Sequence, residues 1–312
     1  MDTADEAIVE LLKRDGRLAH REIARLSGLP RSAVATRMHR LLSSGEVAIR
    51  GVVHPAVSGR GSLAYVGLSV DGCAVPVASR IAERDDVSFV SLPTGHHDVV
   101  TELRAESALA IDTAVGELRA IPGVRAIDTV PYVEVIRDVV GPTGVLHHTV
   151  DATDLMLLRA LQENGRASYV ELAGLVALSP AGVRRRVVRL VEGQVIRIGA
   201  LVRQSGRDHQ VAMGLGIRLA GDHRDVTEAL LGMPAVSFLA RTLGRFDLLT
   251  TLRSFTPGQL TEALEAVRSL PGVHGVESWS HLRFVKESYA STHLATSLAT
   301  HLPSNLPSNL GG

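Results

Sequence analysis

The sequence has few aromatic side chains and no excess of charge of either sign. Aromatic residues make up 3% of its 312 residues, and 33 basic side chains balance 33 acidic ones. This composition excludes a polybasic arm, an aromatic stacking surface for single-stranded nucleic acid and a disordered acidic tail. Any contact with nucleic acid must therefore come from a local concentration of basic residues.

Cysteine and long apolar runs are also scarce. The single cysteine, Cys73, cannot form a disulfide within the chain, and no group of Cys or His residues has the spacing of zinc ligands. No run of about eighteen apolar residues occurs, and the N-terminus is acidic and amphipathic, so neither a membrane span nor a secretion signal is expected. We therefore expect a cytoplasmic protein with no metal site and no membrane contact.

An internal repeat organises the chain. When the sequence is shifted by 149 positions, Gly16 falls on Gly165, and the tripeptide Val-Ser-Phe at 87–89 falls on the same tripeptide at 236–238. Further matches are spread along the whole length of both halves. They indicate that a complete two-part unit has been duplicated.

Each unit begins with three short helical patterns and continues with a two-residue periodicity. In the first unit, apolar residues recur at helical spacing over 5–15, 19–27 and 32–43, with a tight turn at 28–30. Three short helices with this turn are typical of a helix-turn-helix domain. The rest of each unit follows the order strand, helix, strand, strand, helix, strand, which predicts a ferredoxin-like antiparallel sheet with two helices on one face.

The sequence thus predicts an α+β chain in which two winged-helix or helix-turn-helix domains alternate with two ferredoxin-like β-α-β-β-α-β domains. One face of each sheet would be uncovered, and sheets rich in Val, Ile and Leu tend to stack, so we expect association through these faces. The predicted divisions are a first helix-turn-helix domain at 1–50, a first ferredoxin-like domain at 60–137, a linker at 138–150, a second helix-turn-helix domain at 151–199, a second ferredoxin-like domain at 208–288 and a disordered tail at 289–312.

Basic charge is concentrated on the third helix of each unit. Residues 30–44 and 179–191 contain three and four arginines and no acidic side chain. A helix in the DNA major groove needs such a surface, because small side chains allow close approach to the bases and arginines bind guanine or phosphate. A solvated helix face is the alternative, and the recurrence of the pattern in both units disfavours it. The predicted DNA-contacting residues are Arg31, Ser32, Thr36, Arg37 and Arg40 in the first unit and Ala181, Arg184, Arg185, Arg186 and Arg189 in the second.

With these features, both units resemble the Lrp/AsnC family of feast-or-famine transcription regulators. The second unit carries the resemblance in DATDLMLLRALQENGRAS, VELA, LSPAGVRRRVVRLVEGQVI and LGRFDLLTTL, and the first unit carries it in DTADEAIVELLKRDGRLAHREIARLSGLPRSAVATRMHRLLSSGEV and TGHHDVVTEL. It covers nearly all of 1–137 and 150–287. The resemblance implies an N-terminal domain that binds DNA. It also implies a C-terminal domain that pairs subunits through its sheet and binds a small effector, commonly an amino acid.

The resemblance further implies an effector region at a glycine followed three residues later by an aspartate. Gly95 with Asp98 and Gly244 with Asp247 match this motif. A purely structural role is the alternative, with the glycine ending a strand and the aspartate capping a turn. The residues between glycine and aspartate differ between the two units, which would alter or abolish one of the two effector pockets.

An ordinary family member has one unit per chain and dimerises, so a chain with two units is expected to be a covalent pseudo-dimer with two unlike reading heads. We predict a sequence-specific transcriptional regulator that binds double-stranded DNA at an imperfect palindrome and responds to a small effector such as an amino acid. We also expect further assembly into homo-oligomers through the sheet faces, and no other cofactor.

Two alternatives stay open. A heme-pathway decarboxylase branch also resembles this family, so an enzyme with the same combination of domains is one of them. The other is a small-molecule sensor that has lost contact with DNA. The chain has no dinucleotide loop, Walker loop, HExxH or GxSxG motif, and an enzyme would have no use for arginine-rich reading helices. We therefore predict a regulator without enzymatic activity.

Overall fold

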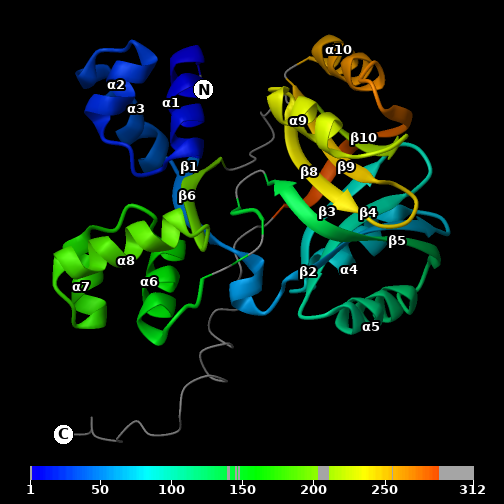
Figure 1. The fold of residues 1–312 in the computed structure, drawn as a ribbon, viewed down its shortest axis with the longest axis horizontal. Helices are drawn as coiled ribbons and strands as arrows, with labels where there is room; N and C mark the ends of the chain where they lie inside the picture. The colour runs from blue at the N-terminus through cyan, green and yellow to red at the C-terminus, as the bar shows by residue number, and fades with distance from the viewer. Residues whose placement is uncertain are drawn as a thin grey trace, which may run out of the picture.

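A computed structural model describes residues 2–138, 141–144, 146, 148–202, 211–254 and 256–287 (Figure 1). The predicted tail at 289–312 lies outside the described residues, as do parts of the predicted linker. The described residues form a helical body at one end and a strand-rich body flanked by helices at the other (Figure 1). Among them, no helix is both long and apolar enough to cross a membrane.

Each half of the chain begins with three helices, which confirms the predicted helix-turn-helix domains. Capping boxes begin the first helix of each domain, because the side chains of Asp2 and Asp151 accept hydrogen bonds from the backbone three residues on. Gly28 ends the second helix with φ 71°, a left-handed conformation that favours glycine. The helices are α1 (Thr3–Arg14), α2 (His20–Ser27), α3 (Arg31–Ser43), α6 (Ala152–Glu163), α7 (Tyr169–Val176) and α8 (Pro180–Glu192).

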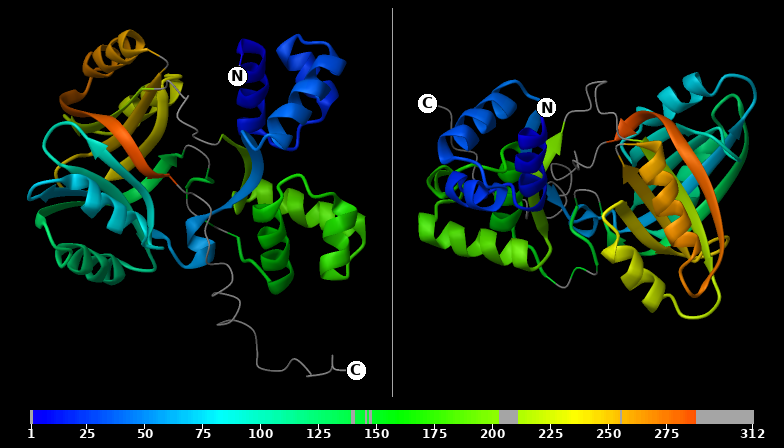
Figure 2. Two further views of the ribbon diagram at one scale, coloured as in Figure 1. Left: turned by 180° about the vertical axis from the view of Figure 1, so that it is seen from behind. Right: turned by 90° about the horizontal axis from the view of Figure 1, so that it is seen from above.

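The two helix-turn-helix domains share one hydrophobic core. Strand β1 (Val47–Val53) pairs antiparallel with β6 (Ile196–Val202) between the two domains (Figure 2). Helix α1 packs against β6 and helix α6 packs against β1, so each domain rests on the strand of the other. Buried apolar side chains from all six helices and both strands form a single cluster. The two domains are therefore packed against each other as one body.

The remaining strands form two ferredoxin-like sheets in the predicted order. A short 3-10 helix, η1 (Pro55–Ser58), leads from β1 into the first sheet. The first set comprises β2 (Ser62–Val70), α4 (Ala74–Ala82), β3 (Val87–Pro93), β4 (Val99–Ala105), α5 (Ala108–Arg119) and β5 (Val124–Arg137). The second set comprises β7 (Val211–Leu219), α9 (Arg224–Gly232), β8 (Val236–Thr242), β9 (Leu248–Ser254), α10 (Pro257–Arg268) and β10 (Val273–Glu287).

The two sheets join edge to edge into a closed barrel with the strand order β10-β3-β4-β2-β5-β8-β9-β7. Strand β5 pairs first with β2 of its own half and then with β8 of the other half. Strand β10 does the same with β7 and then β3. Helices α4 and α5 cover one half of the barrel and α9 and α10 cover the other (Figure 2).

The barrel interior buries the sheet faces that the sequence leaves uncovered. An apolar cluster from both halves fills the space between the sheets, consisting of Tyr65, Val100, Val130, Phe246, Leu249 and Trp279. These faces therefore associate within one chain. Association between copies of the chain has to use another surface, which corrects the expectation that copies assemble through the sheet faces.

Candidate nucleic-acid interface

Helices α3 and α8 bury one face and expose the other. Val34 of α3 and its counterpart Val183 of α8 are fully buried. Two of the predicted DNA-contacting residues, Arg37 and Arg186, are half-buried. The other predicted contact residues are exposed, namely Arg31, Ser32, Thr36, Arg40, Ala181, Arg184, Arg185 and Arg189.

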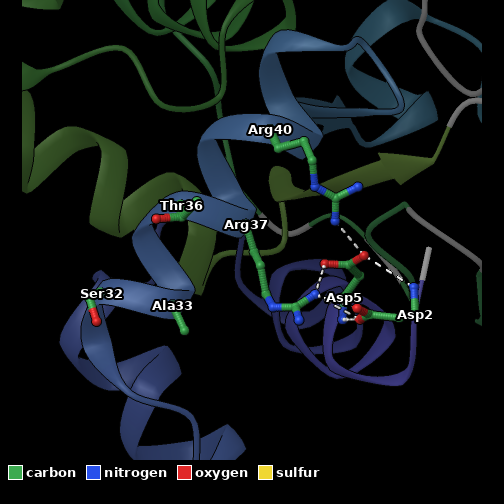
Figure 3. Close-up of a pocket in the computed structure, with 7 residues that line it drawn as sticks. All are labelled: Asp2, Asp5, Ser32, Ala33, Thr36, Arg37 and Arg40. Carbon is green, nitrogen blue, oxygen red and sulfur yellow. Dashed lines mark hydrogen bonds and ion pairs between the residues drawn. The ribbon is translucent and has the colours of Figure 1, made fainter.

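Two arginines of α3 are bound by carboxylates of α1 (Figure 3). Arg37 Nη1 lies 2.7 Å from Asp2 Oδ2 and 2.8 Å from Asp5 Oδ1. Arg40 Nη2 lies 2.5 Å from Asp5 Oδ2. The side chain of Asp5 is 2% exposed and that of Asp2 is 58% exposed. The network therefore has an inner, buried carboxylate and an outer, exposed one.

The inner carboxylate is strongly stabilised in its charged form. Burial raises the pKa of Asp5, but hydrogen bonds from Arg40 and Arg37 outweigh this effect and lower the pKa to about 2. The pKa of Asp2 is also lowered, by its hydrogen bonds with Arg37 and with the backbone of Asp5. Both carboxylates are thus ionised at neutral pH.

The second helix-turn-helix domain repeats this network with its own residues. Arg186 Nη1 lies 2.6 Å from Asp151 Oδ2 and 2.9 Å from Asp154 Oδ1, and Arg189 Nη2 lies 2.7 Å from Asp154 Oδ2. The exposed fractions match as well, at 1% for Asp154 and 52% for Asp151. The network is therefore a property of the duplicated unit.

The outer carboxylate and the predicted base-reading side chains line the same groove. This open groove, with a volume of about 800 Å³, lies between α1 and α3 (Figure 3). Its lining residues are Asp2, Asp5, Ser32, Ala33, Thr36, Arg37 and Arg40. Sequence reasoning missed the role of the aspartates, although their recurrence at equal positions in both units was a signal for it.

The remaining predicted arginines lie outside the two ion-pair networks. In the described part of the chain, no ion pair joins Arg31, Arg184 or Arg185 to a carboxylate. Each carries its charge on the exposed face of its domain. These three side chains are therefore available to a polyanion without the loss of an internal contact.

The predicted effector motifs have well-defined structural contacts. Gly95 and Gly244 have φ of 101° and 105°, which disfavour any other residue. The Asp98 carboxylate accepts a hydrogen bond from the backbone of the last residue of β2 at 2.9 Å, and Asp247 makes the equivalent bond at the end of β7 at 2.7 Å. These contacts account for the four residues as turn-forming elements, and effector binding by them stays a prediction.

Within the two motifs, His97 and its counterpart Phe246 enter the space between the sheets, and these two side chains differ in chemistry. His97 is 9% exposed and packs over Gly67, where a Cβ would lie 2.4 Å from the imidazole. Phe246, its counterpart, is 4% exposed and packs over Gly216. His97 Nε2 is buried and finds no hydrogen-bond partner among the described residues, and burial lowers the pKa of His97. The two halves of the barrel are thus chemically unequal at this point.

A guanidinium links the two halves next to this histidine. Arg245 Nη1 lies 3.2 Å from Asp128 Oδ2 on β5, and its Nη2 lies 2.7 Å from Glu277 Oε2 on β10. His97 Nε2 lies 3.8 Å from the same Asp128 carboxylate. Among the described residues, no group of three His, Cys, Asp or Glu side chains is close enough together to hold a metal ion.

Comparison with known proteins identifies the helical domains. The family model described as the AsnC-type helix-turn-helix domain matches residues 1–42 and 150–191. The HTH-type transcriptional regulator FL11 of Pyrococcus furiosus is 29% identical over 140 residues, which cover 44% of this chain and 93% of that protein. The HTH-type transcriptional regulator LysM of Sulfurisphaera tokodaii is 25% identical over 134 residues, covering 43% and 96%. Each of these relatives thus corresponds to one unit of the repeat.

A solved structure resembles the tandem arrangement. The siroheme decarboxylase NirDL superimposes with a TM-score of 0.63 and covers 96% of this chain and 99% of its own. The sequence identity is 14%, so this likeness shows the fold alone. It shows that the fold of the whole chain, with both units of the repeat, also occurs in that protein.

Proposed function

Because both halves of this chain carry the AsnC-type helix-turn-helix domain of the Lrp/AsnC family, we propose that the protein is a DNA-binding transcriptional regulator. One observation carries the proposal: two reading helices, whose Arg31, Arg184 and Arg185 are exposed and have no carboxylate partner among the described residues, pack on one shared hydrophobic core. Relatives that match one unit each, such as FL11 and LysM, are named HTH-type transcriptional regulators.

We further propose that one chain acts as a covalent pseudo-dimer with two unlike reading heads. Helix α3 presents Ser32 and Thr36 where helix α8 presents Ala181 and Arg185. Arginines and helix N-termini would position each head on phosphates, while one or two side chains per head would read bases. Each bidentate arginine contact to a base contributes about 1–3 kcal/mol of discrimination. The preferred site is therefore an imperfect palindrome.

We propose that a small effector, such as an amino acid, acts on the heads as one unit. The shared core and the β1–β6 pairing support this mechanism, because they pack the two heads against each other. An effector bound near the motif at 95–98 or the motif at 244–247 would instead alter the bridge that Arg245 makes between the halves, or the assembly of several chains. A thermal-shift screen of amino acids tests the binding, and a ligand beside His97 loses its stabilising effect in His97→Phe.

Assembly of copies through the outside of the barrel is also part of the proposal. Val133 and Leu282 are counterparts in the repeat, and each lies at a bulge where β5 or β10 crosses to the other sheet. Both are exposed, at 46% and 72%. Because the repeat relates the two positions, each could contact its equivalent in another copy of the chain across a symmetric interface.

An enzyme related to siroheme decarboxylase is the second candidate, favoured by the likeness in fold over the whole chain. The buried and unpaired Nε2 of His97 between the sheets would be its chemical focus. Against it, aromatic side chains fill the space between the sheets, and Arg245 is already paired with two carboxylates. An absorbance titration with iron-containing tetrapyrroles decides between the enzyme and the regulator, because the regulator is expected to cause no change in their absorbance spectrum.

Genomic footprinting of the full chain tests the regulator directly. We expect protected sites that contain two related but unequal half-sites about one helical turn apart or a multiple of it. A fluorescence titration of one such site at low ionic strength, with a scrambled duplex as control, then measures specificity. Equal affinity for all duplexes, or no affinity, contradicts the proposal.

A further inference from the structure

The outer aspartates of the two ion-pair networks lie on the surface proposed to face DNA. Asp2 lines the same groove as Ser32 and Thr36, and its carboxylate is more than half exposed (Figure 3). Asp151 is 52% exposed and has the same partner arrangement in the second domain. A carboxylate at that place repels the phosphates of DNA and so disfavours binding.

Capping of the helix does not require that charge. Asp2 and Asp151 are N-cap residues of α1 and α6. Asparagine is as good an N-cap as aspartate, because the side-chain oxygen alone accepts the backbone hydrogen bond. Support for the arginines does not require it either, since the buried Asp5 and Asp154 each bind two of them. Apart from its favourable interaction with the positive end of the helix dipole, the outer charge therefore acts on Arg37 or Arg186.

The geometry makes the outer carboxylate a competitor of phosphate. Arg37 Nη1 contacts Asp5 on the buried side of the network and Asp2 on the open side. A phosphate oxygen that enters the groove could replace Asp2 while Arg37 keeps its contact with Asp5. Arg186 stands between Asp154 and Asp151 in the same way. Each exchange trades one charge-assisted contact for another and so adds little net affinity.

We propose that Asp2 and Asp151 restrain Arg37 and Arg186, and thereby suppress sequence-independent binding to DNA. In each domain two arginines and two aspartates cancel, so among the described residues the arginines of α3 and α8 that keep an uncompensated charge are Arg31, Arg184 and Arg185. Affinity then depends more on base contacts, which raises specificity. The inference rests on the proposed DNA binding and names a control element of the same surface.

The test uses the double variant Asp2→Asn with Asp151→Asn in the full chain. Both asparagines keep the N-caps, and thermal unfolding checks that the fold is retained. We expect the affinity for a scrambled duplex to rise about three- to tenfold at low salt, and the plot of log affinity against log salt to steepen by about 1 for each released arginine. The ratio of specific to scrambled affinity falls.

A matched control removes the same two charges elsewhere on α1 and α6. Glu10 and Glu163 are exposed, pair with neighbours on their own helices and do not line the groove. Glu10→Gln with Glu163→Gln should leave the salt dependence close to that of the unmodified protein. If the aspartate variant binds scrambled DNA equally or more weakly than the unmodified protein, or if the control gains as much, the inference is wrong.

A second readout separates this inference from the proposed function. Heparin is a polyanion without bases, so its retention on a column reports released arginines in the absence of any specific site. If the unmodified protein shows no preference for duplex DNA, the proposed function fails. In that case the proposed restraint is supported if the variant with Asp2→Asn and Asp151→Asn elutes from heparin at higher salt than the control with Glu10→Gln and Glu163→Gln. It is contradicted if the two variants elute together.

Discussion

Arg17 and Arg166, which are counterparts in the repeat, each donate hydrogen bonds to the carbonyl groups on either side of the other. Arg17 binds the carbonyl oxygens of Gly165 at 2.8 Å and Ala167 at 3.0 Å. Arg166 binds the two equivalent carbonyls of the first domain at 2.9 and 3.2 Å. This exchange joins the two helix-turn-helix domains at the turns after α1 and α6, next to the β1–β6 pair.

Replacing these arginines should weaken the union of the two domains. Arg17→Ala or Arg166→Ala leaves two partly buried carbonyls without a donor, so we expect a loss of about 1–3 kcal/mol in the free energy of unfolding for each. Urea denaturation measures it. Arg21→Ala, on the exposed side of α2, serves as the control and should change stability little. Equal losses in the three variants contradict the assignment.

Gly165 should not tolerate a side chain. A Cβ there would lie 2.8 Å from the Ile198 side chain and 3.1 Å from the backbone of Arg50. Gly165→Ala is expected to cost about 1–3 kcal/mol through overpacking at the contact between the two domains. Gly174 lies within α7 and has open space around it, so Gly174→Ala should stabilise the helix by up to about 1 kcal/mol. Thermal unfolding measures both variants. The expected result is a change of stability in opposite directions, and a loss of stability in both variants would contradict it.

Arg185 is expected to contribute most of the specific DNA contact of α8. It is exposed on the face opposite Val183 and has no carboxylate partner among the described residues. Arg185→Ala should reduce specific affinity by about 1–3 kcal/mol, which is roughly 5- to 150-fold. Lys13→Ala removes a basic residue from α1 that already pairs with Glu10 and should matter much less. Similar losses for both variants in a fluorescence titration would place the DNA elsewhere.

Because Asp5 carries a buried carboxylate, we expect the free energy of unfolding to depend on pH in acid solution. Its pKa of about 2 in the folded protein lies below the ordinary value of 3.8. The stabilisation is therefore complete above pH 4 and is lost as the pH falls through 2. We expect the stability difference between the unmodified protein and Asp5→Asn to shrink between pH 4 and pH 2 in urea denaturation. A difference that stays constant over this range would show that the ion pairs with Arg37 and Arg40 contribute nothing.

Periodicity and duplication predicted the elements well, because both are local properties of the chain. The helices of each helix-turn-helix domain and the strand order of each ferredoxin-like domain follow from the spacing of apolar residues. Helical spacing also placed Ser32, Thr36 and Arg185 on an exposed face. The burial of Val34 and Val183 follows from the same spacing.

The partners of the arginines could not be deduced in this way. Arg37 and Arg40 are arginines of the same helix as Arg31, yet they alone meet carboxylates at the N-terminal end of α1, because α1 packs against α3 at that point. Crossing depends on how the side chains of two helices pack, which a pattern along one helix does not encode. For the same reason, the interpretation of all arginines as one DNA-reading set merged two populations, one paired and one unpaired.

The sequence by itself determined the two repeated units, their secondary structure and the concentration of arginines on α3 and α8, since these depend on residue order and spacing. Tertiary structure alone decided that β5 and β10 cross between sheets, that Arg17 and Arg166 join the reading heads, and that Asp2 and Thr36 line one groove. Each of these relations joins residues far apart in the chain. Their free energies arise from packing and hydrogen bonding in three dimensions, so they exist only once the chain has folded.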